Sequence, residues 1–254
     1  MKAFLRNLTT PSGALWILSH TVMVLLGAIF LLLHPSTTWG QGVTEAIGGA
    51  LIASGIVGMT LFLYVFTTET LKSRIEAVTK AGLIKIFSGR SVLIRDEYHT
   101  RLAQASRIDL VGFGLSAFRE DYINEFVGWS RRADVRILLI DPDFPTPEHS
   151  LADQRDREEN NTVGKIRSDV QAFESAVSNL SGLNRRRFKV HRVRAIPAIN
   201  MFRIDDDVFW GPYLMNQQSR NTPTLLATRG GFLFDMLQKH FDALWAQSSP
   251  SPIS

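Results

Sequence analysis

Acidic side chains that follow one apolar run are the first residues whose spacing could support chemistry. Asp141 ends the run at residues 135–140, and further carboxylates follow at Asp143, Glu148 and Asp153. Because α/β folds commonly place their ligand crevice where a buried strand ends, Asp141 is a candidate ligand-binding residue. Clustered carboxylates could also hold Mg²⁺. However, an Asp-Pro-Asp segment is typical of a solvated turn, so the sequence predicts no metal and no other cofactor.

Two arginines are candidates for binding a phosphorylated ligand. Arg155 opens the helix predicted after Asp141, and Arg203 lies in a predicted strand pair. A guanidinium fork matches a phosphate group in both shape and charge. The alternative for Arg155 is a salt bridge with an acidic neighbour such as Asp141, which would use its charge inside the protein.

Motifs for nucleophilic or nucleotide chemistry are incomplete or missing. Gly112 and Gly114 follow a predicted strand, but a dinucleotide fingerprint needs a third glycine where Ala117 stands. A tight strand-to-helix turn is the better explanation of these two glycines. The sequence has no G-x-S-x-G, H-E-x-x-H or Walker A segment. It has no Cys, which excludes disulfides and thiolate metal sites, and its 6 His residues are scattered without ligand spacing.

The densest charge in the chain is a basic segment that overlaps a predicted strand. Such a segment could meet nucleic acid or anionic lipid head groups. The net charge is only +4 and few aromatic residues alternate with the cations, which argues against nucleic acid as a partner. We interpret the segment as a solvated strand face. Its cations are Arg185, Arg186, Arg187, Lys189, Arg192 and Arg194.

These candidates follow a membrane anchor. Residues 14–33 and 47–66 are apolar runs without a charged side chain. Each is long enough to cross a bilayer core of roughly 30 Å. Lys2 and Arg6 precede the first run, more Lys and Arg follow the second, and the loop at 34–45 has none. The chain is therefore predicted to be a multi-pass membrane protein with both termini cytoplasmic, in a bacterial inner membrane. A cleaved signal peptide is a poorer explanation, because the first run is too long and a second span follows it.

Small residues and one histidine lie inside the predicted spans. Ala50, Ser54 and Gly58 are spaced four apart, so they share one face of the second span. Small residues allow close helix packing, either within one hairpin or between copies of the chain. His20 could relay protons, but a neutral histidine bonded to a carbonyl or to Ser19 is the more economical interpretation.

The remaining chain is predicted to be one α/β domain. Its division is a transmembrane hairpin at 1–70, a helical linker at 71–82, the α/β domain at 83–247 and a disordered tail at 248–254. Strand-like and helix-like segments alternate, which predicts a mixed sheet with helices on both faces. One long helix is predicted at 153–180, beginning in its charged part. The central strands should bury Leu110, Val111, Leu138, Leu139 and Ile140.

Residues 84–245 resemble one half of the phospholipase D-like fold. The resemblance rests on DLVGFGLSAF, on VRILLIDPD, and on MFRIDDDVFWGPYL followed by TPTLL and a helix ending in FDALW. Active members of that family carry H-x-K-x4-D. Here Asn200, Phe202 and Asp207 stand at the His, Lys and Asp positions, and Gly211 begins the segment where Gly-Ser would be. The resemblance therefore implies the fold without the activity, because asparagine cannot replace the histidine nucleophile.

These observations predict a membrane-anchored, non-catalytic phospholipase D-like domain. It would bind a phosphorylated small molecule, a nucleotide or a partner and couple binding to the hairpin, as a sensor or a membrane-acting effector, for instance in bacterial defence. The alternative is a phosphodiesterase or phospholipid hydrolase with a metal-assisted carboxylate site. The expected partners are the lipid bilayer and further copies of the chain, through the spans or the α/β domain. The predicted ligand-binding residues are Arg155, Arg203, Asp141, Tyr213 and Asn200.

Overall fold

The computed structural model describes residues 11–33, 37–89 and 92–252. The chain divides into two compact units, Met1–Glu76 and Ala77–Ser254, which we describe separately.

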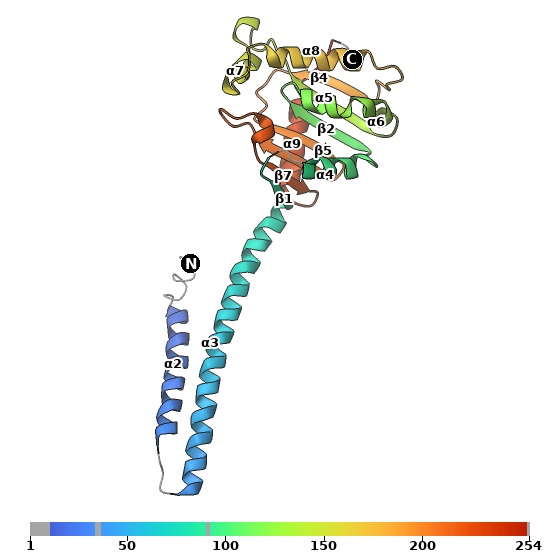
Figure 1. The fold of residues 1–254 in the computed structure, drawn as a ribbon. Helices are drawn as coiled ribbons and strands as arrows, with labels where there is room; N and C mark the ends of the chain where they lie inside the picture. Colours follow the sequence, from blue (N-terminus) through green and yellow to red (C-terminus); the bar gives the residue numbers. More distant parts are fainter. Residues whose placement is uncertain (1–10, 34–36, 90–91, 253–254) are drawn as a thin grey trace. The chain divides into compact units, whose positions relative to one another are not determined.

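The first unit contains two apolar helices, α2 (Pro11–Leu32) and the first part of α3 (Thr38–Ala81) (Figure 1). Two stretches are long and apolar enough to cross a membrane, Ala14–Leu32 and Thr38–Val65. This agrees with the predicted spans. The sidedness of the hairpin and the kind of membrane stay predictions.

Glycines allow α2 and α3 to pack closely. A Cβ added to Gly27 would lie 2.7 Å from the Gly48 carbonyl oxygen, and one added to Gly58 would overlap the His20 ring. His20 stacks on Trp16, and its Nδ1 lies 2.8 Å from the Trp16 carbonyl oxygen. His20 is therefore explained by packing and by contact with a carbonyl group within the hairpin, which agrees with the interpretation of the sequence.

The three residues of the predicted small-residue face of the second span differ in their exposure. Gly58 is buried against α2, whereas Ala50 and Ser54 are exposed. Packing within one chain explains Gly58, and association between copies through Ala50 and Ser54 stays a prediction.

The second unit is built on an eight-stranded sheet in the order β1-β7-β6-β5-β2-β3-β4-β8. Strands β2, β3 and β4 run parallel, and the other neighbouring pairs are antiparallel. The predicted mixed sheet is therefore confirmed. The strands are β1 (Leu83–Phe87), β2 (Arg107–Gly112), β3 (Asp134–Ile140), β4 (Phe188–Val193), β5 (Ile199–Ile204), β6 (Asp207–Pro212), β7 (Thr224–Thr228) and β8 (Ser249–Pro250).

Helices cover both faces of this sheet, as predicted (Figure 1). The helix α9 (Phe232–Ala246) packs on one face. Five helices pack on the other face, together with the short 3-10 turn at Ile123–Glu125. They are α4 (Val92–Leu102), α5 (Ser116–Tyr122), α6 (Phe126–Arg132), α7 (Leu151–Glu158) and α8 (Lys165–Ser178).

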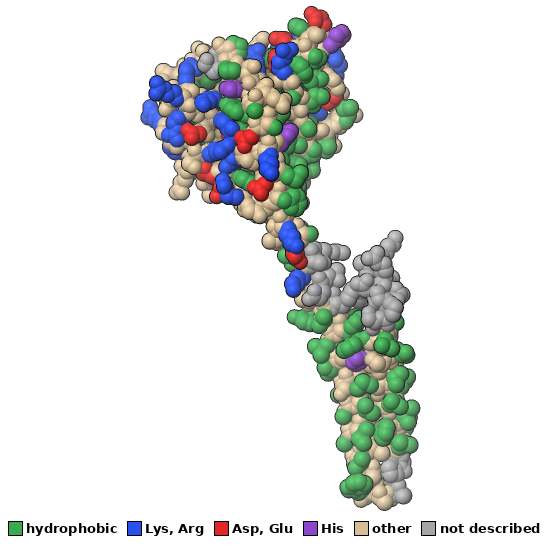
Figure 2. Space-filling view, turned by 180° about the vertical axis from the view of Figure 1, so that it is seen from behind, with side chains coloured by type: hydrophobic (Ala, Val, Ile, Leu, Met, Phe, Trp, Pro, Cys, Tyr) green, Lys and Arg blue, Asp and Glu red, His purple; other side chains and the backbone are tan. Residues whose placement is uncertain are grey.

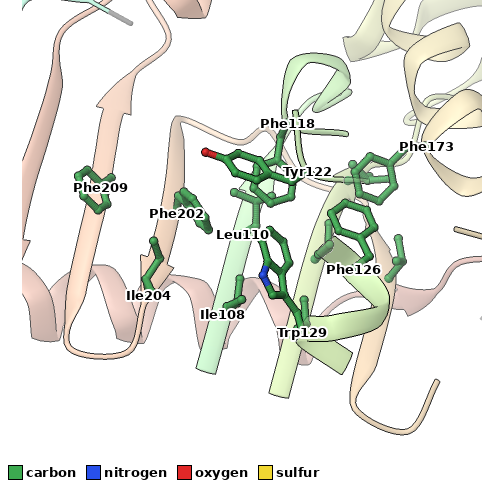
Figure 3. Packing of buried hydrophobic residues seen from close by; sticks show 14 of the residues in the cluster. Ile108, Leu110, Phe118, Tyr122, Phe126, Trp129, Phe173, Phe202, Ile204 and Phe209 are labelled. Carbon is green, nitrogen blue, oxygen red and sulfur yellow. The ribbon is translucent and has the colours of Figure 1, made fainter. Parts of the chain in front are cut away.

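The two faces have separate hydrophobic cores. Leu110, Leu139 and Ile140 belong to the larger core under α4–α8, and Val111 and Leu138 belong to the core under α9. All five are buried, which confirms the predicted central strands. Figure 3 shows how aromatic rings from α5 and α6 fill the larger core against β2 and β5.

Two predicted segments differ from the structure. The long helix expected at 153–180 is broken into α7 and α8, and Gly164 lies between them with φ 91°. The cause of the break is Asp156, whose buried carboxylate accepts hydrogen bonds from the Gly164 and Ile166 amides and so begins a new helix. Within the tail expected to be disordered, Ser249–Pro250 forms β8, which pairs with β4, and Ser251 is buried with its hydroxyl 2.6 Å from Glu174. Residues 253–254 of this tail lie outside the described residues.

The junction between α3 and the sheet depends on one glycine. The predicted linker at 71–82 is the continuation of α3, which ends at Ala81. Gly82 has φ 72°, and a Cβ there would lie 2.8 Å from the Gly231 Cα. Only glycine combines this backbone conformation with such a close approach.

Candidate functional site

A cavity of about 350 Å³ opens at the carboxyl end of β2. Because β5 runs antiparallel to β2, the beginning of β5 lies at the same end of the sheet. The start of α5, the α7–α8 connection and the loop after β6 complete its walls. The volume falls in the range of about 300–1,000 Å³ that is usual for small-molecule sites. This cavity is our candidate functional site.

Aromatic rings form much of the cavity wall. Phe118 and Phe202 meet edge to face with ring centroids 5.2 Å apart, and Phe113 and Tyr213 do so at 4.8 Å. Phe118, Tyr122 and Phe202 lie together in Figure 3. Burial raises the pKa of the Tyr213 hydroxyl, so this group stays neutral and can act only as a hydrogen-bonding group. Such a wall suits a planar or apolar ligand group.

Asn200 provides an amide in the wall of this cavity. It lies in β5 directly opposite Gly211 of β6, where a Cβ would approach the Asn200 Nδ2 to 3.4 Å. Among the residues that the structure describes, none forms a hydrogen bond with the Asn200 side chain. A half-buried amide without a protein partner can donate to a ligand and accept from it.

The cavity rim carries two cations and two carboxylates. Lys165 forms an ion pair with Asp169 at 2.6 Å, and Glu159 is paired with the buried Arg155. Arg220 is exposed, and its guanidinium has no partner within the described part of the chain. Arg220 is therefore a rim cation whose guanidinium is available to an anionic ligand group.

Arg155, a predicted ligand-binding residue, lies behind this wall and does not line the cavity. It is 3% exposed and donates hydrogen bonds to the carbonyl oxygens of Leu214 (3.1 Å) and Gln217 (3.0 Å). Its acidic partners are Glu158 and Glu159 in place of the expected Asp141. Arg155 thus fixes the loop after β6, and direct contact with a ligand stays a prediction for it.

Arg203 and Asp141, the other two charged candidates, also lie outside the cavity lining. Arg203 is buried on the α9 face, 3.4 Å from the fully buried Asp109, and donates to the Asp205 carbonyl oxygen at 2.7 Å. Burial and then the neighbouring Arg107 lower the pKa of Arg203. Asp141 lies 3.5 Å from Arg194. Of the five predicted residues, the structure brings together Asn200 and Tyr213 only.

The residues that align with the family's catalytic segment are separated as well. Asn200 and Phe202 line the cavity, but Asp207 forms an ion pair with Arg101 at 2.6 Å. His191 lies on the α9 face, where its ring stacks on Trp245 at 4.0 Å. Among the described residues, the cavity lining includes no histidine and no cysteine, and no group of three or more His, Cys, Asp or Glu is arranged to hold a metal ion.

Several cavity residues were not predicted from the sequence. Phe118 and Tyr122 of α5 belong both to the larger core and to the cavity lining. Lys165 is the first residue of α8 and Arg220 lies in a 3-10 turn at Ser219–Asn221. Neither belongs to a motif, so the sequence contains no signal for their approach. The helix break at Gly164 would have been the one useful sign for Lys165.

Comparisons with known proteins give similarities at low identity. No protein-family model and no curated protein sequence matches the chain. Similar solved structures include TrmBL2, an archaeal chromatin protein whose structure shows a novel mode of DNA binding. Its sequence identity to this chain is 12% and the TM-score is 0.41, over 80% of this chain and 71% of that one. They also include the phospholipase D family member Nuc from Salmonella typhimurium, with 13% identity and a TM-score of 0.41 over 66% of this chain and 97% of that one. NucT from Helicobacter pylori has 12% identity and a TM-score of 0.38 over 66% of this chain and 98% of that one.

Proposed function

We propose that the chain is a membrane-anchored, phospholipase D-like binding domain without histidine-based catalysis. Its cavity takes up a phosphorylated small molecule that carries a planar ring, such as a nucleotide, and occupancy is coupled to the membrane hairpin. The observation that carries this proposal is the Asn200 amide, which has no partner among the described residues, within an aromatic cavity whose rim has an arginine without an ion-pair partner in the described part of the chain.

Each part of the cavity corresponds to a part of such a ligand. Phe118, Phe202 and Tyr213 offer ring faces and edges for stacking. The Asn200 amide can form a donor and an acceptor bond with the edge of a heterocycle. Arg220 is free to bind the phosphate group with its fork.

The described cavity lining includes no histidine, which favours binding over histidine-based hydrolysis. Covalent phosphodiester chemistry of the phospholipase D type needs an imidazole near the phosphorus atom, and His191 lies on the opposite face of the sheet. The alternative of a carboxylate-based hydrolase loses support, because Asp141 lies outside the lining and next to Arg194.

The proposal extends to the membrane and to assembly. Both termini are proposed to be cytoplasmic in a bacterial inner membrane, which would give the domain access to soluble nucleotides. Association of copies through the exposed small-residue face of α3 is the simplest way in which binding could change the anchor, as in a sensor or an effector.

A screen with whole ligands and their halves tests the proposal. The full-length protein in lipid nanodiscs is mixed with the nucleoside 5′-monophosphates, the matching nucleosides and ribose 5-phosphate, and its Tm is measured. At least one nucleotide should raise Tm more than either of its halves, because each half keeps only part of the contacts. Equal effects of ribose 5-phosphate and the nucleotides, or no effect of any compound, would contradict the proposal.

The affinity of the Arg220→Gln variant for the nucleotide tests whether Arg220 contacts the phosphate group. Losing a charge-assisted hydrogen bond costs about 1.5–3 kcal/mol, which is about tenfold or more in affinity. Arg95→Gln is the matched control, because Arg95 is exposed on α4 and does not line the cavity. Equal affinities in the two variants would remove Arg220 from the site.

A further inference from the structure

A second hollow lies at the opposite end of the parallel strands from the cavity. Its volume is about 280 Å³, and it is found where β2, β3 and β4 begin. Figure 2 shows lysine and arginine side chains gathered on one side of the domain. We name the hollow the cationic groove, and its lining consists of Arg107, Asp134, Val135, Arg136, Arg186, Arg187 and Lys189.

The strand register places like charges side by side in this groove. Arg203, Asp109, Arg136 and Lys189 are successive partners across β5, β2, β3 and β4. Asp109 accepts hydrogen bonds from Arg136 at 2.6 and 2.9 Å, but Lys189 has only Arg136 directly beside it. Like charges directly opposite each other on neighbouring strands are destabilising. The end of this row therefore lacks a negative charge.

Three arginines of the groove are held in place by the protein. Arg136 is fixed by Asp109 and by Asp242 at 2.9 Å, and Arg107 is fixed by Asp109 at 3.1 Å. Arg187 pairs with Asp134 at 2.9 Å and donates to the carbonyl oxygens of residues 131 and 132. Rigid guanidinium groups bind an anion with less loss of side-chain freedom than mobile ones.

Two further cations of the groove have no partner of their own. Lys189 and Arg186 are exposed, and neither side chain forms a hydrogen bond or ion pair with any residue that the structure describes. The groove therefore combines three fixed cations with two free ones around an open space.

We propose that the cationic groove binds a phosphate group of a small molecule, at a site separate from the aromatic cavity. Lys189 and Arg186 contact the phosphate oxygens, and Arg136 and Arg107 provide a fixed positive field behind them. The exposed carboxylates of Asp134 and Asp242, 70% and 48% exposed, flank the groove and repel the long backbone of a nucleic acid. A compact phosphate presents fewer charges to these two carboxylates than the backbone of a nucleic acid does. It also supplies the charge that the row of strand residues lacks.

Calorimetry with two small probes tests the site and the source of the phosphate. The full-length protein in nanodiscs of zwitterionic lipid is titrated with inorganic pyrophosphate and with glycerophosphoglycerol, the soluble head group of an anionic lipid. Lys189→Gln and Arg186→Gln should each weaken binding of the preferred probe by about tenfold or more. The probe that binds more tightly shows whether a free phosphate compound or a lipid head group is the source.

A matched lysine and the cavity variant serve as controls. Lys239→Gln removes an exposed lysine of α9 that does not line the groove, and Asn200→Ala alters the aromatic cavity. Both variants should bind pyrophosphate with the affinity of the wild type. A failure of the groove proposal can therefore be distinguished from a failure of the cavity proposal. Lys189→Gln should also raise the Tm of the unliganded protein, because it removes the repulsion from Arg136.

Three results would overturn the proposal. The first is no binding of either probe at millimolar concentration. The second is an equal loss of affinity in Lys239→Gln, which would indicate a general surface charge effect. The third is binding of a labelled single-stranded oligonucleotide at least about tenfold more tightly than pyrophosphate, which would make the groove a contact for a polymer.

Discussion

Replacing Asp109 by asparagine should strongly destabilise the α/β domain. The Asp109 side chain is fully buried between the sheet and α9, and Arg136 and Arg203 are 20% and 5% exposed beside it. The substituted amide would keep the shape of the side chain but would leave the buried Arg203 without its carboxylate and Arg136 with the more exposed Asp242 only. Removing one partner of a buried ion pair costs about 3–5 kcal/mol.

The loss can be measured by thermal unfolding of the full-length protein. Tm changes by about 2–4 °C per kcal/mol for a domain of 150–250 residues, so Asp109→Asn should lower Tm by about 6–20 °C. Tryptophan fluorescence follows the domain, because Trp129 and Trp245 lie in or beside its two cores. Asp242→Asn is the control, since Asp242 contacts Arg136 as well but is 48% exposed. Equal Tm losses in the two variants would refute the account of a buried charge network.

Further predictions concern the core, a half-buried histidine and the membrane topology. Leu139→Ala should cost about 2–5 kcal/mol in denaturant unfolding, because Leu139 is fully buried in the larger core, while the exposed Met236→Ala should cost less than about 0.5 kcal/mol. Burial and then the charge of Lys189 lower the pKa of His191, so the unfolded chain takes up the proton first and stability falls as the pH drops below the unfolded value. The Tm advantage of wild type over His191→Gln should therefore shrink between about pH 7.5 and about pH 5.5, and an advantage independent of pH would contradict this reasoning. Reporter fusions at Trp39 and Ser254 should report opposite sides of the membrane, and a cytoplasmic signal at Trp39 would reverse the proposed orientation.

The sequence predicted those parts of the fold that depend on continuous patterns. The apolar runs identified the two spans and strands β2 and β3, because a buried strand or span consists mostly of apolar side chains. Asp109 and Arg136 are charged residues within these two strands. The strand pair predicted around Arg203 corresponds to the β5–β6 hairpin, which turns at Asp205. Both signals are local in the chain, so no knowledge of tertiary contacts was required.

Features that depend on tertiary contacts were not predictable in this way. The break between α7 and α8 is stabilised by the buried carboxylate of Asp156, whose role emerges only after the chain folds back on it. The order of the tail depends on the free edge of β4 and on Glu174.

For the candidate site, the sequence predicted the two cavity residues that lie in the segments of the family resemblance. It did not predict the other cavity residues. Asn200 and Tyr213 do line the cavity. Arg155 and Arg203 were chosen for their charge, but both are buried and bonded within the protein, which no local pattern reveals. Arg220 was overlooked because nothing in the sequence distinguishes a free arginine from a paired one.

The most direct test of the central claim is the affinity of the Asn200→Ala variant for the nucleotide that raises Tm most. The claim is that the aromatic cavity binds this ligand through the Asn200 amide. Isothermal titration of full-length protein should show affinity at least about fivefold lower for Asn200→Ala than for wild type, since one or two hydrogen bonds are lost. Asn124→Ala, which removes an exposed amide outside the cavity lining, should bind like wild type. Wild-type affinity in Asn200→Ala would contradict the claim.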